Sequence, residues 1–195
     1  MTVEASTPAP STGATPPPRF FWERPHAGGR PDGADLAALR RGAGRDPGTV
    51  PQMWRYYTTL NQEGWGTPGL RAEHAALVLF AMHQQSQTRL MHAAGVGLGA
   101  AVRCLRESDK FSSDAVDRRF EAAATATSLS EASYHLRGLV RQLRGLPQPL
   151  DYTRLYWDLL SWQNPDRIGQ VRRRWGSQYF PGRDRKTETA VSTTS

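Results

Sequence analysis

The sequence predicts an all-α protein, a helical bundle arranged in two small helical lobes. Apolar residues recur at helical spacing along most of the chain, and helix-starting and helix-ending residues bracket those segments. No segment alternates apolar and polar residues over the length of a strand. With 195 residues, the chain is long enough for one sizeable core or for two small lobes. We expect an N-terminal lobe at 21–108 and a C-terminal lobe at 109–182.

The two ends of the chain differ from the rest in composition. The N-terminal end is rich in Pro, Thr, Ser and Ala and holds almost no large apolar side chain, and the C-terminal end is also polar. Such segments cannot bury enough apolar surface to offset the entropy that is lost when they become ordered. We therefore expect disordered tails at 1–20 and 183–195. The start also lacks the basic and apolar regions of a signal peptide.

Capping signals mark where individual helices begin. Thr67 is suited to cap a helix that has Pro68 in its first position, and Asp151 is suited to cap a later one. Ser128 and Glu131 have the spacing of a capping box. The expected helical segments are 32–42, 49–60, 64–85, 98–106, 113–127, 128–147, 151–163 and 164–179.

The later segments each carry an apolar face that predicts core packing. Trp162 and Trp175 fall on such faces, so we expect them in the core, whereas Trp54 and Trp65 lie near loops and their environment is left open. For residues 155–162 the amino-acid composition alone would also allow a strand, which is the alternative to the helix expected at 151–163. The apolar faces comprise Leu98, Val102, Leu105; Val116, Phe120, Ala123, Thr127; Leu136, Leu139, Val140, Leu143; Leu155, Leu159, Trp162; and Ile168, Val171, Trp175, Tyr179.

The charge balance favours an anionic partner. The chain has 25 basic and 18 acidic residues, for a net charge of +7, and most of the excess lies outside the expected tails. All the basic residues except Lys110 and Lys186 are arginine, whose planar fork of donors suits phosphate oxygens. This balance is typical of nucleic-acid-binding proteins, although a GC-rich genome also raises arginine content.

Two further features bear on where the protein acts. Cys104 is the single cysteine, which excludes a disulfide framework and a multi-cysteine zinc site and fits a reducing cytoplasm. No apolar stretch approaches the length needed to span a membrane. We expect a soluble, cytoplasmic protein with no membrane partner.

A glycine-rich stretch, AAGVGLGAAVRCLR, occupies residues 93–106. Its spacing fits the loose dinucleotide-binding form G-x-G-x-x-A, but that fingerprint needs a strand before it and a second strand that ends in an acid, and both are missing. We favour an alternative in which Gly95 and Gly97 make a turn while Gly99 lets a neighbouring helix approach closely. Arg103, just beyond, is a candidate phosphate contact.

No constellation of catalytic or metal-binding residues is apparent. His74, His83 and His92 are nine residues apart, so none forms the i, i+3 or i, i+4 pair that a helical metal site uses. The sequence has no HExxH motif, no Walker loop and no G-x-S-x-G elbow. We expect no enzymatic activity, no metal and no cofactor.

Arg137, Arg141 and Arg144 lie at i, i+4 and i+7 of an expected helix, so their side chains share a face about 60° wide. No acidic residue occurs between Glu131 and Asp151 to neutralise this stripe. Like charges at this spacing repel one another unless an anion lies between them. The stripe is therefore a candidate nucleic-acid contact, and the alternative is a solvated helix face or a set of internal ion pairs.

The order of short motifs along the chain resembles a known family. "LRRG" is followed by "GVGLGAAVRCL", "DRRF", "HLRGLVRQL", "LDYTRLYWDLLSW" and "RRRWGSQYF". This succession resembles the small subunit of the type I-E CRISPR surveillance complex, Cascade (the CasB family), over residues 36–180. The resemblance implies a two-lobed helical protein with no catalytic activity of its own.

The resemblance also implies partners and contact residues. In that family two copies sit head to tail inside the complex, bridge its backbone and large subunits, and present a basic surface to the guide RNA–target DNA hybrid and the displaced strand. The implied partners are guide RNA, target DNA, a second copy of the chain, and the Cascade backbone and large subunits. Matching motif positions are Arg41, Arg118, Arg119, Arg137 and Arg167. Arg103, Arg141 and Arg144 are added by the glycine stretch and the arginine stripe.

The expected function is thus a non-catalytic nucleic-acid-binding subunit that stabilises the guide–target hybrid and the displaced strand in antiviral defence. One alternative is a structural helical adaptor whose arginines contact only acidic protein surfaces. Another is a helix-turn-helix reader, which would prefer one duplex sequence over single strands.

Overall fold

The computed structural model describes residues 20–181, which form helices joined by loops. This range contains seven α-helices and three short 3₁₀ helices, and its only β-type pairing is an isolated bridge between His92 and Leu150. The all-α prediction is confirmed. The expected tails lie outside the described residues except for Phe20, whose ring stacks on that of Trp22 with 5.0 Å between centroids.

Most of the expected helices form close to their predicted bounds. Residues 155–162 are helical, so the alternative strand is wrong. The α-helices are α1 (Gly33–Arg40), α2 (Pro68–Gln84), α3 (Leu98–Arg106), α4 (Ser113–Thr125), α5 (Leu129–Gly145), α6 (Tyr152–Trp162) and α7 (Pro165–Tyr179). The 3₁₀ helices are η1 (Phe21–Glu23), η2 (Ala27–Gly29) and η3 (Pro51–Tyr56).

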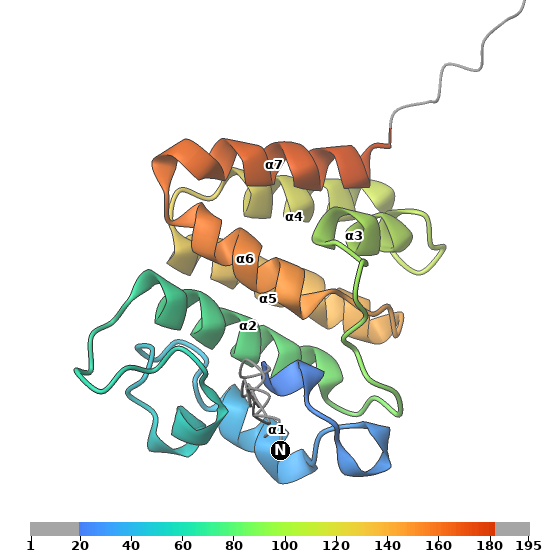
Figure 1. Cartoon of the computed structure of the whole chain (residues 1–195). Coiled ribbons are helices and arrows are strands. Elements are labelled where there is room, and N and C mark those ends of the chain that lie inside the picture. Colours follow the sequence, from blue (N-terminus) through green and yellow to red (C-terminus); the bar gives the residue numbers. More distant parts are fainter. Residues whose placement is uncertain (1–19, 182–195) are drawn as a thin grey trace, which may run out of the picture.

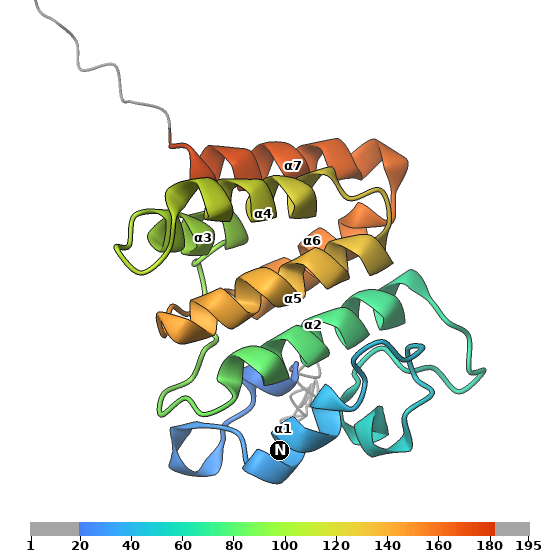
Figure 2. The same ribbon diagram turned by 180° about the vertical axis from the view of Figure 1, so that it is seen from behind.

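The helices are stacked from one end of the molecule to the other (Figure 1). α1 lies at one end and packs on α2, which packs in turn on α5 and α6. α3, α4 and α7 form the other end, with α3 against α7 and α4 against α5. Seen from behind, α4 and α5 face the viewer while α6 lies behind them (Figure 2). The division into two lobes at 108/109 stays a prediction.

The central helix α2 is enclosed on all sides, because every residue from Ala72 to Gln84 is buried. Its polar residues therefore need internal partners. The Glu73 carboxylate accepts hydrogen bonds from the backbone N–H and the hydroxyl of both Thr58 and Thr59. These bonds take the two threonines out of any helix, which explains why the segment expected at 49–60 forms only the short η3.

The predicted caps are present, with one change in detail. The Thr67 hydroxyl accepts a hydrogen bond from Leu70 N–H, and the Ser128 hydroxyl accepts one from Glu131 N–H. The Glu131 carboxylate, however, accepts from Thr127 rather than from Ser128, so the reciprocal half of the capping box is shifted by one residue. Thr127 is exposed and lies beyond the end of α4, so its expected place on the apolar face of that helix is wrong.

The glycine-rich stretch has the packing role that we favoured. Gly95 has a φ of +85° and its N–H donates to the Asp151 carboxylate. Gly99 lies so close to α7 that an added Cβ would overlap the carbonyl oxygen of Trp175 and lie 3.0 Å from the backbone nitrogen of Tyr179. The missing side chain therefore allows α3 and α7 to approach each other, backbone against backbone.

The expected core tryptophans meet between α6 and α7. Trp162 and Trp175 are buried and stacked, with 4.9 Å between ring centroids. The buried carboxylate of Asp158 accepts a hydrogen bond of 2.6 Å from the Trp175 indole and pairs with Arg174. Trp54 and Trp65, whose environment was left open, are 52% and 69% exposed.

Candidate nucleic-acid interface

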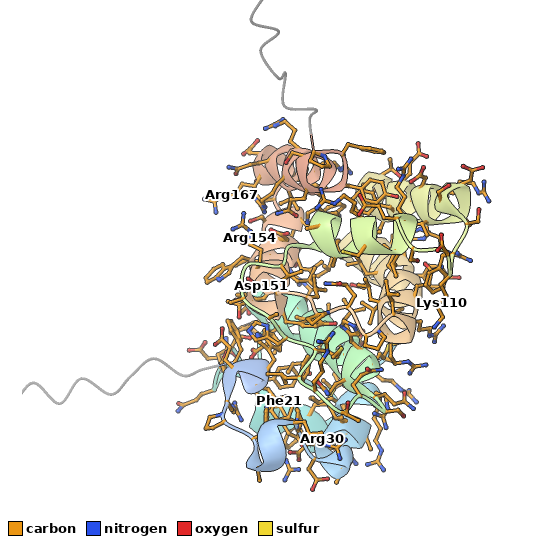
Figure 3. All side chains as sticks on the ribbon, turned by 90° about the vertical axis from the view of Figure 1, so that its right-hand side faces the viewer. Phe21, Arg30, Lys110, Asp151, Arg154 and Arg167 are labelled. Atoms are coloured by element: carbon orange, nitrogen blue, oxygen red, sulfur yellow. The ribbon has the colours of Figure 1, made fainter. Side chains whose placement is uncertain are left out.

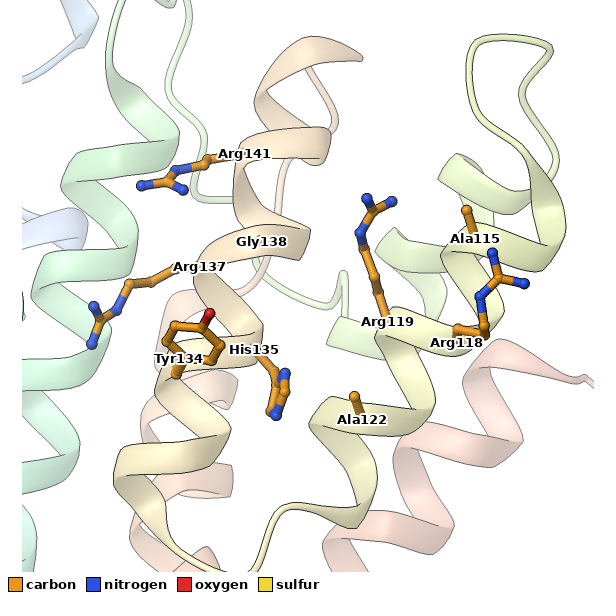
Figure 4. Close-up of a pocket in the computed structure, with 9 residues that line it drawn as sticks. All are labelled: Ala115, Arg118, Arg119, Ala122, Tyr134, His135, Arg137, Gly138 and Arg141. Carbon is orange, nitrogen blue, oxygen red and sulfur yellow. The ribbon is translucent and has the colours of Figure 1, made fainter.

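A groove with a volume of about 440 Å³ lies between α4 and α5 (Figure 4). Both helices turn their apolar faces into the protein, so the residues that line the groove come from the opposite, polar faces. Val116 and Phe120 are buried on α4, and Leu136 and Val140 are buried on α5. The groove is lined by Ala115, Arg118, Arg119, Ala122, Tyr134, His135, Arg137, Gly138 and Arg141.

Four of the predicted contact arginines line this groove. Arg119 extends from α4 into the space between the two helices, whereas Arg118 points to the other side of α4 (Figure 4). Arg137 and Arg141 reach from α5 toward α2. Arg137 is half-buried and the other three are exposed. Two adjacent helices thus contribute four arginines to the lining of one groove, and the guanidinium group of Arg119 lies between the helices.

These four arginines differ from several others in having no acidic partner. Within residues 20–181, none of the four has a carboxylate oxygen within 4.0 Å or makes a side-chain hydrogen bond. By contrast, Arg106 pairs with Asp117 at 2.9 Å and Arg55 pairs with Asp35 at 2.7 Å. The positive charge around the groove is therefore not neutralised by the described part of the chain.

Arg137 connects the groove to a second hollow, of about 260 Å³, that is bordered by residues 42–47. His74 lines the same hollow and its Nε2 lies 2.9 Å from the Gly42 carbonyl oxygen. Burial lowers the pKa of His74, and the nearby positive charge of Arg137 acts in the same direction. Arg45 and Arg71 also line this hollow, and they outnumber its single carboxylate, that of Asp46.

The remaining predicted contact residues do not join the groove. Arg144 is half-buried and donates to the Gln85 side chain at 3.0 Å, so the stripe expected at Arg137, Arg141 and Arg144 is divided. Arg103 pairs with Glu107 at 3.8 Å.

Two further candidates lie elsewhere on the surface. Arg41 is exposed at the C-terminal end of α1. Arg167 lies beside Arg154 on the face of α6 and α7, opposite Lys110 (Figure 3). Arg172, which flanks the Trp175 stripe, donates to backbone carbonyl oxygens and lies over the Trp162 ring.

Comparison with known proteins bears directly on this arrangement. The family model described as "CRISPR-associated protein Cse2" matches residues 35–180. The chain belongs to this Cse2 family. The resemblance to CasB, the small subunit of Cascade, is thereby confirmed.

Individual Cse2 relatives agree with this assignment. The chain is 29% identical over 168 residues to the CRISPR-associated protein Cse2 of Thermus thermophilus, covering 85% of this chain and 90% of the relative. The crystal structure of CasB from Thermobifida fusca matches with 33% identity and a TM-score of 0.62, covering 75% of this chain and 83% of that one. CasB from Thermus thermophilus matches with 27% identity and a TM-score of 0.58, covering 76% and 86%.

Five groove residues of this Cse2 chain were not predicted, and three of them lie on α5. Tyr134, His135 and Gly138 line the groove beside the arginines. Tyr134, Gly138 and Arg141 stand at i, i+4 and i+7, so helical spacing alone could have placed the tyrosine on the edge of the arginine stripe. These residues form a groove because α4 and α5 are spaced apart at this point. The sequence of neither helix predicts that spacing.

Two other features, a metal-binding cluster and a membrane-spanning helix, do not occur in the described part of this Cse2 chain. Within residues 20–181, no three His, Cys, Asp or Glu side chains lie close enough together to hold a metal ion. In the same range, none of the helices combines the length and the apolar character needed to cross a membrane.

Proposed function

We propose that the protein is a non-catalytic subunit of an RNA-guided CRISPR surveillance complex, in which it binds nucleic acid through the groove between α4 and α5. The observation that carries this proposal is the set of four arginines around one groove, none of them paired with a carboxylate in the described chain. They are Arg118, Arg119, Arg137 and Arg141.

The chemistry of this groove suits a phosphate backbone. Guanidinium groups that repel one another gain most from an anion placed between them, and arginine donates to phosphate oxygens in a fixed fork. Pairing of a guide RNA with one DNA strand is a nearly balanced exchange of one duplex for another. A few backbone contacts to the guide–target hybrid or to the displaced strand are therefore enough to favour the opened state. The partners we propose are guide RNA, target DNA, a second copy of the chain, and the backbone and large subunits of Cascade in the cytoplasm.

A pair of charge-matched double variants tests this proposal. Arg119→Ala with Arg141→Ala removes two groove charges, whereas Arg30→Ala with Arg173→Ala removes two exposed charges elsewhere that have no carboxylate partner within the described residues. We expect the groove variant to bind a labelled single-stranded oligonucleotide at least about tenfold more weakly. The same variant should lower the yield of opened target DNA when it is assembled into the guide-loaded complex.

The control variant separates a specific groove from general attraction. If both double variants weaken binding equally, net charge alone is responsible and the groove assignment is wrong. If neither weakens binding but the groove variant no longer joins the complex, the protein is the structural adaptor considered as the alternative.

A further inference from the structure

Tyr134 is the exposed aromatic residue of the groove. It stands on α5, and 68% of its surface is accessible. Its ring meets the ring of His135 edge-on, with 5.4 Å between centroids, and within the described residues its hydroxyl makes no hydrogen bond. The side chain therefore contributes little to core packing and presents a free aromatic face beside the arginines.

Gly138, one turn further along α5, leaves the floor of the groove open. A Cβ atom added at this position would have no atom within 4 Å, so no neighbouring element requires a glycine here. Glycine is nevertheless a poorer residue than alanine for the interior of a helix. The space above Gly138, next to the exposed ring of Tyr134, can therefore accept a flat ligand from the solvent.

The arginines complete the arrangement around Tyr134. Arg141 follows the tyrosine by two turns on the same face of α5, about 10 Å along the helix axis. Arg119 reaches into the groove from α4 (Figure 4). A ring for stacking, an open floor and two arginine side chains that line the same groove match the parts of a nucleotide: the flat base and its charged phosphate.

We infer that the groove holds an unpaired nucleotide, with its base stacked on Tyr134 above Gly138 and its phosphates at Arg119 and Arg141. Stacking on Tyr134 requires a base with a free face, which a single strand can offer, whereas both faces of a base inside a duplex are covered by its neighbours. Aromatic stacking tolerates any base, so this site recognises a single strand without reading its sequence. The inference rests on the proposed nucleic-acid function and adds the residue on which a base stacks, Tyr134.

An abasic oligonucleotide separates stacking from charge. The full chain is titrated into a labelled oligothymidylate and into a strand of equal length whose central nucleotides lack bases but keep their phosphates. We expect Tyr134→Ala to weaken binding to oligothymidylate about tenfold and to leave binding to the abasic strand unchanged. Tyr134→Phe keeps the ring and should bind like the unmodified chain. Arg119→Ala should weaken binding to both strands.

Two matched controls guard against indirect effects. Gly138→Leu fills the floor and should weaken binding to oligothymidylate, whereas Gly176→Leu places the same side chain on α7, where a Cβ also meets nothing within 4 Å. Trp157→Ala removes an aromatic residue that is 53% exposed on α6 and should have no effect. Circular dichroism of each variant checks that the helices are intact.

The possible outcomes are distinguishable. If the chain binds both strands and Tyr134→Ala changes neither affinity, stacking is wrong while the proposed function stands. If no strand binds to the chain or to its assembled complex, the proposed function itself fails. If Tyr134→Ala spares oligonucleotide binding but releases a protein subunit from the complex, the ring is a protein contact and the inference is overturned. Repeating the titration with oligouridylate shows whether the groove prefers DNA or RNA.

Discussion

A Cβ atom on Gly99 would overlap the backbone carbonyl oxygen of Trp175, because α3 and α7 touch backbone to backbone at this point. The same contact places the stacked pair of Trp162 and Trp175 against the core. α7 therefore depends on a residue with no side chain in α3. This relationship leads to the first of several predictions.

We expect Gly99→Ala to lower the free energy of unfolding by at least about 2 kcal/mol, since the obstructing atoms belong to the backbone and cannot rotate away. Gly176→Ala is the control, because its new Cβ meets nothing and should stabilise α7 by up to about 1 kcal/mol. Urea denaturation of both variants checks this. Equal stability of the two would contradict the close contact of α3 with α7.

The ion pair beneath Trp175 is a second determinant of stability. Asp158 is 1% exposed, pairs with Arg174 and accepts the indole hydrogen bond. We expect Asp158→Ala to cost about 3 to 5 kcal/mol, because it leaves a partly buried guanidinium group without its counter-charge. Glu107→Ala breaks the exposed pair with Arg103 and should cost less than about 1 kcal/mol. Thermal unfolding of the two variants measures the contrast.

His83 makes the stability of the fold depend on pH. It is fully buried, its Nδ1 lies 3.0 Å from the Tyr152 hydroxyl, and burial lowers its pKa to about 4. In the unfolded chain its pKa is about 6.5. The folded state therefore binds this proton less readily, and the stability from neutral His83 is present above pH 6.5 and is lost as the pH falls toward 4.

The difference between these two pKa values corresponds to about 3 kcal/mol of unfolding free energy. Burial lowers the pKa of His74 and His92 as well, so they add to the same trend. We expect His83→Gln, which stays neutral, to show a smaller loss of stability between pH 6.5 and pH 4.5 than the unmodified chain. Parallel pH curves for the two proteins would show that His83 does not titrate in this way.

The groove arginines are expected to serve binding and not stability. Arg137 and Arg141 are neighbours of like charge on α5, and such pairs destabilise a helix by about 0.2 to 0.5 kcal/mol. Arg141→Ala should therefore leave the unfolding free energy unchanged or slightly raised while it weakens oligonucleotide binding. A clear loss of stability would indicate that Arg141 has an internal partner.

The salt dependence of binding counts the phosphates engaged. Each phosphate neutralised on a single strand contributes about −0.7 to the slope of log K against log salt concentration. Four engaged arginines predict a slope of about −3, and the Arg119→Ala, Arg141→Ala double variant should reduce it to about −1.4. A slope near zero for the unmodified chain would exclude a phosphate-binding groove.

The sequence alone was sufficient to predict where most of the helices lie and which residue types occupy their exposed faces. Apolar residues at helical spacing and caps such as Thr67 and Ser128 act within one or two turns, so their effect is local. The single large disagreement, at 49–60, arose because Glu73 binds Thr58 and Thr59 from another helix. A contact across the fold overrode a local preference.

The sequence by itself predicted that this protein is all-α, that it resembles CasB, and that arginines lie on the polar faces of the helices at α4 and α5. The structure showed that the groove arginines have no carboxylate partner within the described residues. Only the tertiary structure decided which of them act together. Packing places Arg119 of α4 in the lining of the same groove as Tyr134 and Arg141 of α5. Arg144 instead donates a hydrogen bond to Gln85, and Arg167 lies on another face of the protein. The physical reason is that helical periodicity sets the direction of a side chain around its own axis. The distance between two helices depends on how the core packs, and no local pattern carries that information.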